Sequence, residues 1–546
     1  MGTRFALILG GISIAFFGVI FRLYDLQLND GSYYFAQAES QRTLANMKSS
    51  LRGTIYLVNQ KGEKFPAASS KEFPEIYVDS SKIEDKQEVA NALAIIADIT
   101  PDEALKKLST KNEYISIIKK ANNSQITKVG ELAQKGIYVR NYSSRSYGTG
   151  NLFAQAIGFV GPDDKQAADV GRTGLEKFYN EKLSGVSKEK DSEDKNDDNR
   201  LLPGEDLLVG IDLSVQKEAE LILSNLITSS KSKSGTVIVQ EPKTGKIIAM
   251  GSLPNFDPNN YSAGKMENYI NPCVEKVYEP GSVFKVLTMA AGIDSGKLTP
   301  DTTYYDEGFV KLSGYTIKNW DGKAYGKVTM TNIIEKSLNT GTAYAEKLIG
   351  HATFSEYVRK FGFGEKTNID LPGEVKGDLR NINPKSSAVA FANAAFGQGV
   401  SVTPLQMITS ISAIANGGLL MRPYLNLGLE ASEVRRVISE DTAKKVTEMM
   451  VSAVDKGHLA QIDGYSVAGK TGTAQVPDLK HGGYTENVVD TYIGFAPATN
   501  PRFTILIKID EPEGAPLAGT TVVPAFKSLA KFLLHYYSLS PDRINN

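Results

Sequence analysis

Hydrophobic and polar positions in the last two thirds of the chain alternate in patterns that predict helices flanking antiparallel strands. Residues 213–231, LSVQKEAELILSNLITSSK, repeat apolar positions with the 3.6-residue period of a helix that covers a core. GTVIVQEPKTGKIIAM follows, two β-rich runs joined by a Pro-Lys-Thr-Gly turn. The predicted buried helical face consists of Val215, Ala219, Ile222, Leu223, Leu226 and Ile227.

A second strand pair is predicted within residues 491–512, with a turn at Thr499-Asn500-Pro501, and residues 523–537 predict an amphipathic closing helix. Helices and antiparallel hairpins in this order predict an α/β or α+β domain over residues 203–546, with an antiparallel sheet flanked by helices.

The residues before this domain mix short β-rich pieces, such as GTIYLV at 53–58, with helical stretches such as KQEVANALAIIADI at 86–99. The tract VSKEKDSEDKNDDNR, residues 186–200, is charged and has no apolar periodicity, so it predicts a solvated linker. We therefore expect a separate β-rich domain over residues 24–200, which ends in this linker.

Residues 5–21, FALILGGISIAFFGVIF, form an uncharged run between Arg4 and Arg22. At 1.5 Å per residue a helix of this run is roughly 25 Å long, close to a bilayer core of about 30 Å. A cleaved signal peptide is disfavoured because FRLYDLQL, without small residues, follows the apolar run. Residues 1–23 are thus expected to be a short cytoplasmic tip and a retained transmembrane helix, with the rest of the chain outside the membrane.

Composition narrows the function classes further. Sixty-one Lys and Arg residues balance 62 Asp and Glu residues, so no basic surface for nucleic acid is indicated. The single cysteine, Cys273, excludes an internal disulfide, and the four histidines show no metal-ligand spacing. We expect no metal and no cofactor.

The first candidate catalytic residues lie in YEPGSVFKVLTMAAGIDSG, residues 278–296, where Ser282 is followed by Lys285 and an apolar helical run. A helix that starts at Ser282 would place both side chains on one face, with a nucleophile at the positive end of the helix. The alternative is a serine helix cap and a surface lysine. Ser-x-x-Lys alone is weak, because it also occurs at Ser116, Ser187, Ser192, Ser230, Ser262 and Ser528.

A serine nucleophile needs a base, and a lysine with an ordinary pKa near 10.4 is mostly protonated. Burial and a second cation would lower that pKa, so the hypothesis requires another lysine and a polar relay. Ser337-Leu338-Asn339 offers the relay, and Lys470-Thr471-Gly472-Thr473, in a β-rich run, offers the lysine. Lys-Thr-Gly also occurs at residues 243–245, where it is ordinary turn chemistry.

The ordered set Ser-x-x-Lys, Ser-x-Asn and Lys-Thr-Gly is the signature of the penicillin-binding enzymes. The chain resembles a class B penicillin-binding protein, a monofunctional transpeptidase of peptidoglycan synthesis. Leu338 replaces the Asp of Ser-Asp-Asn, and the segment RGTIYLVNQKG lacks the family's Asp-Arg pair. Further family-like segments are GRTGLEKFYNEKLSG at 171–185, FGFGEKTNIDLPGE at 361–374 and FGQGVSVTPLQM at 396–407.

The resemblance implies a penicillin-binding transpeptidase fold preceded by an elongated N-terminal pedestal or dimerisation-like domain. It implies that Ser282 is the acylated nucleophile and Lys285 its base. Ser337 and Asn339 would relay protons and bind the substrate backbone, and Lys470 would tune Lys285. The carboxylate would bind at Thr471, Gly472 and Thr473, and the backbone N–H groups of Ser282 and Thr473 would form the oxyanion hole.

The implied substrates are D-Ala-D-Ala stem peptides on lipid-linked glycan strands, and the implied partner is a polytopic glycan polymerase of the shape, elongation, division and sporulation type. Glu279 before Pro280-Gly281-Ser282, with Leu-Pro-Gly-Glu at 371–374, resembles division enzymes more than elongation enzymes. Elongation remains an alternative, as does an inactive scaffold that recruits the polymerase.

Three other interpretations are disfavoured. A bifunctional enzyme would need Glu-Asp-x-x-Phe, but residues 205–209 lack the Phe. A β-lactamase would require neither the membrane helix nor the N-terminal domain. Cys273 is expected to be a small buried residue rather than a thiol nucleophile. Trp320 could line the substrate cleft or be structural.

Overall fold

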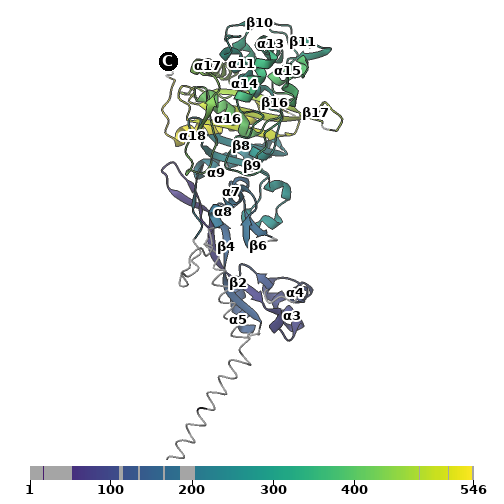
Figure 1. The fold of residues 1–546 in the computed structure, drawn as a ribbon, viewed down its shortest axis with the longest axis vertical. Coiled ribbons are helices and arrows are strands. Elements are labelled where there is room, and N and C mark those ends of the chain that lie inside the picture. Colours follow the sequence, from purple (N-terminus) through teal and green to yellow (C-terminus); the bar gives the residue numbers. More distant parts are fainter. Residues whose placement is uncertain are drawn as a thin grey trace, which may run out of the picture. The chain divides into compact units, whose positions relative to one another are not determined.

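The computed structural model describes residue 16 and residues 52–109, 115–132, 136–163, 166–184, 203–478, 480–514 and 516–543 (Figure 1). The chain divides into two compact units, one of Met1–Gly53, Pro74–Ser143 and Ser184–Glu205, the other of Thr54–Phe73, Ser144–Leu183 and Asp206–Asn546. The predicted membrane helix at 5–21, apart from Phe16, and the linker at 186–200 lie outside the described residues. Within the described ranges, no helix is both long and apolar enough to span a bilayer.

In the smaller unit, helices pack against the last residues of strand β2 (Lys64–Val78) and the short strand β3 (Ile115–Ile118). The helix predicted over 86–99 is confirmed as α3 (Lys86–Ala97), which begins where the Asp85 carboxylate accepts two backbone N–H groups and ends at left-handed Asp98. Two further helices among the described residues of this unit are α4 (Pro101–Leu108), which starts with a Thr100–Glu103 capping box, and α5 (Asn123–Leu132).

The larger unit is built on the predicted antiparallel sheet, whose strand order is β16-β17-β18-β8-β9. Its strands are β16 (Ala468–Pro477), β17 (Tyr484–Ala496), β18 (Phe503–Asp510), β8 (Ser234–Gln240) and β9 (Ile247–Leu253). Both predicted hairpins are confirmed. Gly245 closes the β8–β9 turn at a φ of 84°, which explains the glycine of that Lys-Thr-Gly.

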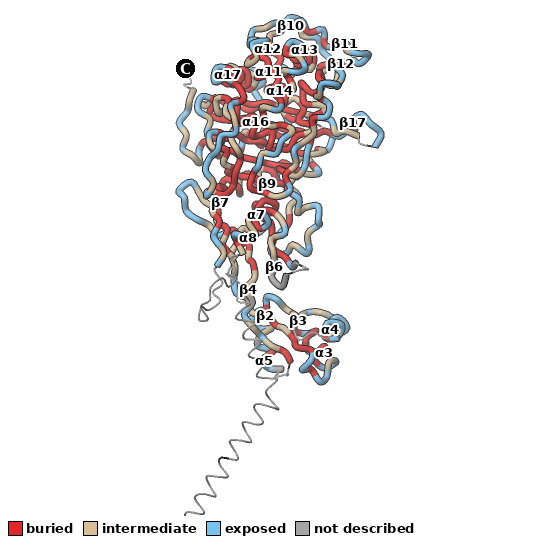
Figure 2. Tube along the Cα trace, in the orientation of Figure 1, coloured by how far each residue is buried: buried red, intermediate tan, exposed pale blue. Residues whose placement is uncertain are grey.

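Helices cover both faces of this sheet, as Figures 1 and 2 show. On one face lie α9 (Leu213–Ser230) and α18 (Val522–Tyr536), where four of the six predicted α9 residues are buried and Ile222 and Ile227 are partly buried. On the other lie α11 (Lys285–Asp294) and α16 (Pro404–Ala415). Strand alternation divides the core accordingly, since Tyr492 packs on the α18 side and Ile493 on the α11 side.

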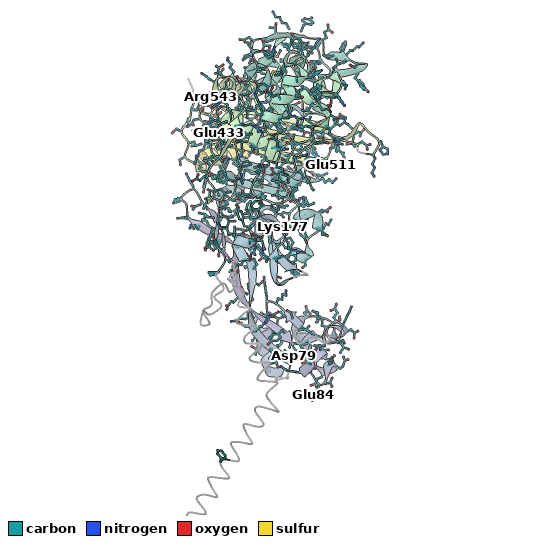
Figure 3. All side chains as sticks on the ribbon, viewed as in Figure 1. Asp79, Glu84, Lys177, Glu433, Glu511 and Arg543 are labelled. Atoms are coloured by element: carbon teal, nitrogen blue, oxygen red, sulfur yellow. The ribbon has the colours of Figure 1, made fainter. Side chains whose placement is uncertain are left out.

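Charged side chains such as Lys177 and Glu433 lie on the outside of the larger unit (Figure 3).

Smaller strands and helices complete the larger unit. Its strands are β1 (Ile55–Val58), β5 (Val160–Asp163), β6 (Gln166–Gly171), β7 (Leu207–Asp212), β10 (Thr303–Asp306), β11 (Phe309–Leu312), β12 (Tyr315–Lys318), β13 (Gly326–Thr329), β14 (Leu419–Met421) and β15 (Glu433–Arg436); β4 (Ile137–Tyr147) belongs to both units. Its helices are α6 (Ala154–Ile157), α7 (Gly174–Phe178), α10 (Pro272–Glu275), α12 (Met330–Lys336), α13 (Asn339–Ile349), α14 (His351–Lys360), α15 (Ala388–Ala395) and α17 (Glu440–Gly457), and α8 (Asn180–Ser184) ends at its boundary.

Candidate active site

Ser282 lies in a single 3-10 turn, η5 (Gly281–Phe284), that leads directly into α11. The α-helix therefore begins at Lys285, three residues later than the sequence predicted. Neither η5 nor α11 has a side-chain cap, so the interpretation of Ser282 as a helix cap is wrong. The Ser282 side chain is partly exposed, while Lys285 and the rest of the first turn of α11 are buried.

Glycines bring the turn that carries Ser282 against the edge strand β16. A Cβ atom on Gly472 would lie 2.9 Å from the Pro280 carbonyl oxygen and 3.0 Å from Val283 Cγ1. Gly281, at a φ of 60°, donates its N–H to the Gly397 carbonyl at 3.0 Å. The glycine of the second Lys-Thr-Gly thus marks a close approach of backbone, and that backbone is the turn bearing Ser282.

Lys285 reaches the Ser-x-Asn motif. Its Nζ donates to the Ser337 carbonyl at 2.6 Å and to Asn339 Oδ1 at 2.7 Å, and lies 3.3 Å from Ser337 Oγ. Ser337 ends α12 in the left-handed conformation, at a φ of 58°, and Asn339 is the first residue of α13. Asn339 Nδ2 is held by the Lys318 carbonyl at 3.0 Å, so the amide oxygen is fixed toward the lysine.

Lys470 approaches the same hydroxyl from β16. Its Nζ lies 3.0 Å from Ser337 Oγ and 3.1 Å from the Thr471 carbonyl oxygen. Among the described residues, neither Lys285 nor Lys470 forms an ion pair with a carboxylate, although their side chains are almost completely buried. Burial, and then the charge of Lys470, hold the pKa of Lys285 well below its ordinary value, and burial lowers the pKa of Lys470 to about 7.

No sequence pattern pointed to one further residue, Asp490. In the β16–β17 register it lies opposite Thr473, whose hydroxyl donates to Asp490 Oδ1 at 2.9 Å. Thr521 donates to the other carboxylate oxygen at 2.7 Å. The carboxyl group is fully buried, and burial raises its pKa to about 6. The one feature of the sequence that could have drawn attention to Asp490 is its position as an acidic residue within the apolar run VVDTYIGFA.

The structure thus brings together Lys285, Ser337, Asn339 and Lys470, and it places the turn of Ser282 against Gly472. Comparison with known proteins identifies the family. Residues 235–531, more than half of the chain, match the family described as "Penicillin binding protein transpeptidase domain". The chain belongs to the penicillin-binding transpeptidases. Residues 48–206 match the "Penicillin-binding Protein dimerisation domain", so the identification as a class B penicillin-binding protein is confirmed.

Relatives of this transpeptidase match it over nearly its full length. Stage V sporulation protein D of Bacillus subtilis is 30% identical, covering 97% of this chain and 86% of the relative. Peptidoglycan D,D-transpeptidase FtsI of Escherichia coli is 26% identical, covering 99% and 93%. The structure of penicillin binding protein 3 from Mycobacterium tuberculosis complexed with aztreonam is 25% identical with a TM-score of 0.70, covering 91% and 98%.

Two residues singled out from the sequence lie apart from this cluster of lysines. Cys273 of the transpeptidase is completely buried, its Sγ lies 3.6 Å from Ser252 Oγ, and burial raises the pKa of the thiol to about 12. It is the small buried residue that was expected. Trp320 is 58% exposed and donates its indole N–H to the Lys336 carbonyl at 3.2 Å, one residue before Ser337. Lining of the substrate cleft and a structural role both stay predictions.

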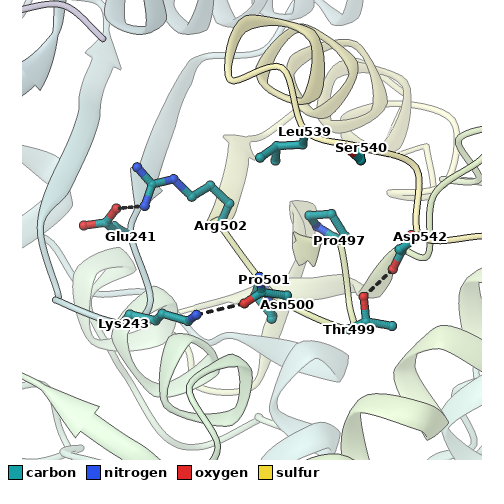
Figure 4. A pocket seen from close by; sticks show the side chains of 10 residues that line it. All are labelled: Glu241, Lys243, Pro497, Thr499, Asn500, Pro501, Arg502, Leu539, Ser540 and Asp542. Carbon is teal, nitrogen blue, oxygen red and sulfur yellow. Dashed lines mark hydrogen bonds and ion pairs between the residues drawn. The ribbon is translucent and has the colours of Figure 1, made fainter. Parts of the chain in front are cut away.

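A separate pocket of about 340 Å³ contains none of the predicted site residues (Figure 4). Two pairs of its polar side chains bind each other: Arg502 pairs with Glu241 at 2.5 Å, and Lys243 donates to Asn500 at 2.8 Å. Across the described ranges, no group of three His, Cys, Asp or Glu residues is arranged to hold a metal. The pocket is lined by Glu241, Lys243, Pro497, Thr499, Asn500, Pro501, Arg502, Leu539, Ser540 and Asp542.

Proposed function

We propose that the protein cross-links peptidoglycan as a D,D-transpeptidase, with Ser282 as the residue that becomes acylated. The observation that carries this proposal is the pair of buried lysines that share the Ser337 hydroxyl beside the Ser282 turn. A nucleophilic serine requires a nearby base that is neutral at working pH. Lys285, one turn along from Ser282 and with its pKa lowered, supplies that base.

Ser337 is suited to pass protons between the two lysines. When Lys285 is neutral, its nitrogen has a lone pair, and the Ser337 hydroxyl can donate to it while accepting from Lys470. A proton taken from Ser282 can then reach the leaving amine through Lys285 and Ser337. Asn339, fixed by Lys318, holds Lys285 in this position and offers an amide to the peptide backbone of the substrate.

The reaction is acyl transfer in two steps. Ser282 Oγ attacks the carbonyl of the D-Ala-D-Ala bond, the C–N bond breaks, and D-alanine leaves with the transferred proton. An amine of a neighbouring stem peptide then attacks the ester, loses a proton to the relay and regenerates the serine. The N–H groups of Ser282 and Thr473 would stabilise the oxyanion in both steps, since Gly472 lets the turn approach β16 closely.

Labelling with a fluorescent penicillin, a β-lactam that resembles D-Ala-D-Ala, tests the proposal. Wild type should be labelled, and Ser282→Ala should not. Ser528→Ala is the matched control, because Ser528 begins another Ser-x-x-Lys, on α18, and its hydroxyl only donates to the Pro524 carbonyl. An unlabelled wild type, or label that persists on Ser282→Ala, would refute the assignment. Release of D-alanine with formation of peptide dimers, followed by mass spectrometry, separates transpeptidation from hydrolysis.

We further infer a division role, a membrane helix at residues 5–21 and a glycan polymerase as partner. Glu279 before Pro280-Gly281-Ser282, and Leu-Pro-Gly-Glu at 371–374, support division, and the uncharged run supports the membrane helix. A fluorescent fusion tests the first: signal along the side wall rather than the septum would favour elongation. A strain that grows normally with Ser282→Ala but not without the protein would favour the scaffold.

A further inference from the structure

The hydroxyl of Thr473 is fully engaged within the protein. It donates to Asp490 Oδ1 at 2.9 Å and accepts the Ala518 N–H at 3.1 Å. A hydroxyl has one proton and two lone pairs. As long as Asp490 is ionised, it can only accept, so the single proton of Thr473 is turned inward. Thr473, although partly exposed, then has no proton to offer to a ligand carboxylate.

We propose that Asp490 is a positioning residue whose protonation state decides whether Thr473 can donate a hydrogen bond to the carboxylate of the acyl donor. This rests on the proposed function and on the expectation from the sequence that this carboxylate binds at Thr471, Gly472 and Thr473. A protonated Asp490 donates its own proton to Thr473, and the Thr473 proton is released toward the cleft. An ionised Asp490 both retains that proton and places a second negative charge next to the carboxylate.

The surroundings of Asp490 support a change of protonation near neutral pH. Thr473 faces it from β16, Ile509 from β18 and Thr521 from the residues before α18. On its own strand the nearest titratable side chain on the same face is Tyr492, a buried phenol whose pKa burial raises. No described Lys, Arg or His forms an ion pair with Asp490. Burial therefore dominates and raises its pKa to about 6, against the hydrogen bonds from Thr521 and Thr473.

The test compares wild type with Asp490→Asn. The second-order rate constant for acylation of Ser282 is measured from pH 5 to 9 with benzylpenicillin and with its methyl ester, which lacks the carboxylate. The amide of Asp490→Asn can donate to Thr473 at every pH, so this variant should react roughly three- to tenfold faster than wild type with benzylpenicillin at pH 8. With benzylpenicillin, the rate constant of Asp490→Asn divided by that of wild type should fall toward one below about pH 6. Taking this ratio cancels the titration of the lysines, which both proteins share.

Two further variants separate positioning from a merely structural role. Adding Thr473→Val to Asp490→Asn should remove the gain, and adding Thr473→Ser, which keeps the hydroxyl, should retain it. A ratio that does not change with pH, or an equal gain with the methyl ester, would overturn the inference. Failure of benzylpenicillin to label wild-type Ser282 would instead overturn the proposed function, so the two failures are distinguishable.

Discussion

Lys285, on α11, and Lys470, on β16, approach the same atom, the Ser337 hydroxyl oxygen, at 3.3 Å and 3.0 Å. The two amines are buried and are paired with no described carboxylate, so charging both at once is costly. Protonation of one therefore disfavours protonation of the other. A neutral amine and a charged amine joined through one hydroxyl form a short path for a proton.

Replacing Lys470 should move the pH dependence of acylation. The charge of Lys470 lowers the pKa of Lys285, in addition to burial, so Lys470→Met should raise the pKa of Lys285. Less neutral base is then present at a given pH, and the acidic limb of the penicillin acylation profile should shift to higher pH. Loss of the relay should also slow acylation at pH 7 by about 100-fold.

Lys243→Met is the control for that experiment. Lys243 begins the other Lys-Thr-Gly of the chain, in the β8–β9 turn, and donates to Asn500. Its replacement should leave the pH profile unchanged. An acidic limb of Lys470→Met that coincides with that of wild type would contradict the electrostatic coupling of the two lysines.

Ser337 combines a hydroxyl with a left-handed backbone, and two substitutions separate these properties. Ser337→Gly and Ser337→Ala both remove the hydroxyl and should slow acylation to a similar extent, about 100-fold. Only glycine adopts a φ of 58° without steric cost, so Ser337→Gly should be more stable than Ser337→Ala by about 1 kcal/mol. Thermal unfolding measures stability and penicillin labelling measures acylation. Near-normal acylation by Ser337→Gly would exclude the relay.

The sequence predicted the fold of the larger unit because apolar periodicity is local and strong there. The closing helix was predicted at 523–537 and is found at Val522–Tyr536, and the buried face of α9 is the predicted one. Three motifs also predicted which side chains would gather around Lys285. The start of α11 was misplaced because the Ser282 turn is 3-10, with its conformation set by contacts of Gly281 with β16 and Gly397 that no local pattern reveals.

Substituting Gly472 should impair catalysis with a small loss of stability. In Gly472→Ala the new Cβ would lie 2.9 Å from the Pro280 carbonyl oxygen, which is backbone, so η5 and β16 must separate by a few tenths of an ångström. The N–H groups of Ser282 and Thr473 would then be less well placed for an oxyanion. The acylation rate constant should fall by about tenfold or more, while the dissociation constant of the non-covalent penicillin complex changes little.

Gly457→Ala provides a matched comparison. Gly457 is the last residue of α17, its φ is ordinary, and a Cβ atom added to it would meet no other atom within 4 Å. Acylation by this variant should equal that of wild type. Equal acylation by Gly472→Ala would show that the close approach of η5 to β16 does not matter for the oxyanion.

Asp490 could not be predicted, since its importance arises from tertiary structure. The register of β16 with β17 places it opposite Thr473, and the residues before α18 bring Thr521 and Ala518 to the same place. These residues are too far apart in the sequence for a motif with a fixed spacing to connect them. The same limit applies to Lys318, whose carbonyl fixes Asn339 across 21 positions of sequence.

Ionisation of Asp490 should lower the free energy of unfolding at neutral pH, and the size of this decrease should depend on pH. Its pKa is raised from 3.8 to about 6 by burial, so the folded state binds this proton more tightly than the unfolded state. The favourable contribution of the protonated group is complete below about pH 4 and is lost as the pH rises through 6. Asp490→Asn cannot ionise, so at pH 8 it should be more stable than wild type by about 3 kcal/mol.

Thermal unfolding of both proteins between pH 4 and 8 measures this difference, which should be small at pH 4 and largest above pH 7. Thr521→Val, which removes a hydrogen bond that favours the ionised form, should make the total loss of stability between pH 4 and 8 larger than in wild type. A difference between Asp490→Asn and wild type that stays constant over this range would show that Asp490 ionises as an ordinary carboxyl group. If both predictions hold, a buried acid that lowers stability at neutral pH and also positions the Thr473 proton is better explained by catalysis than by folding.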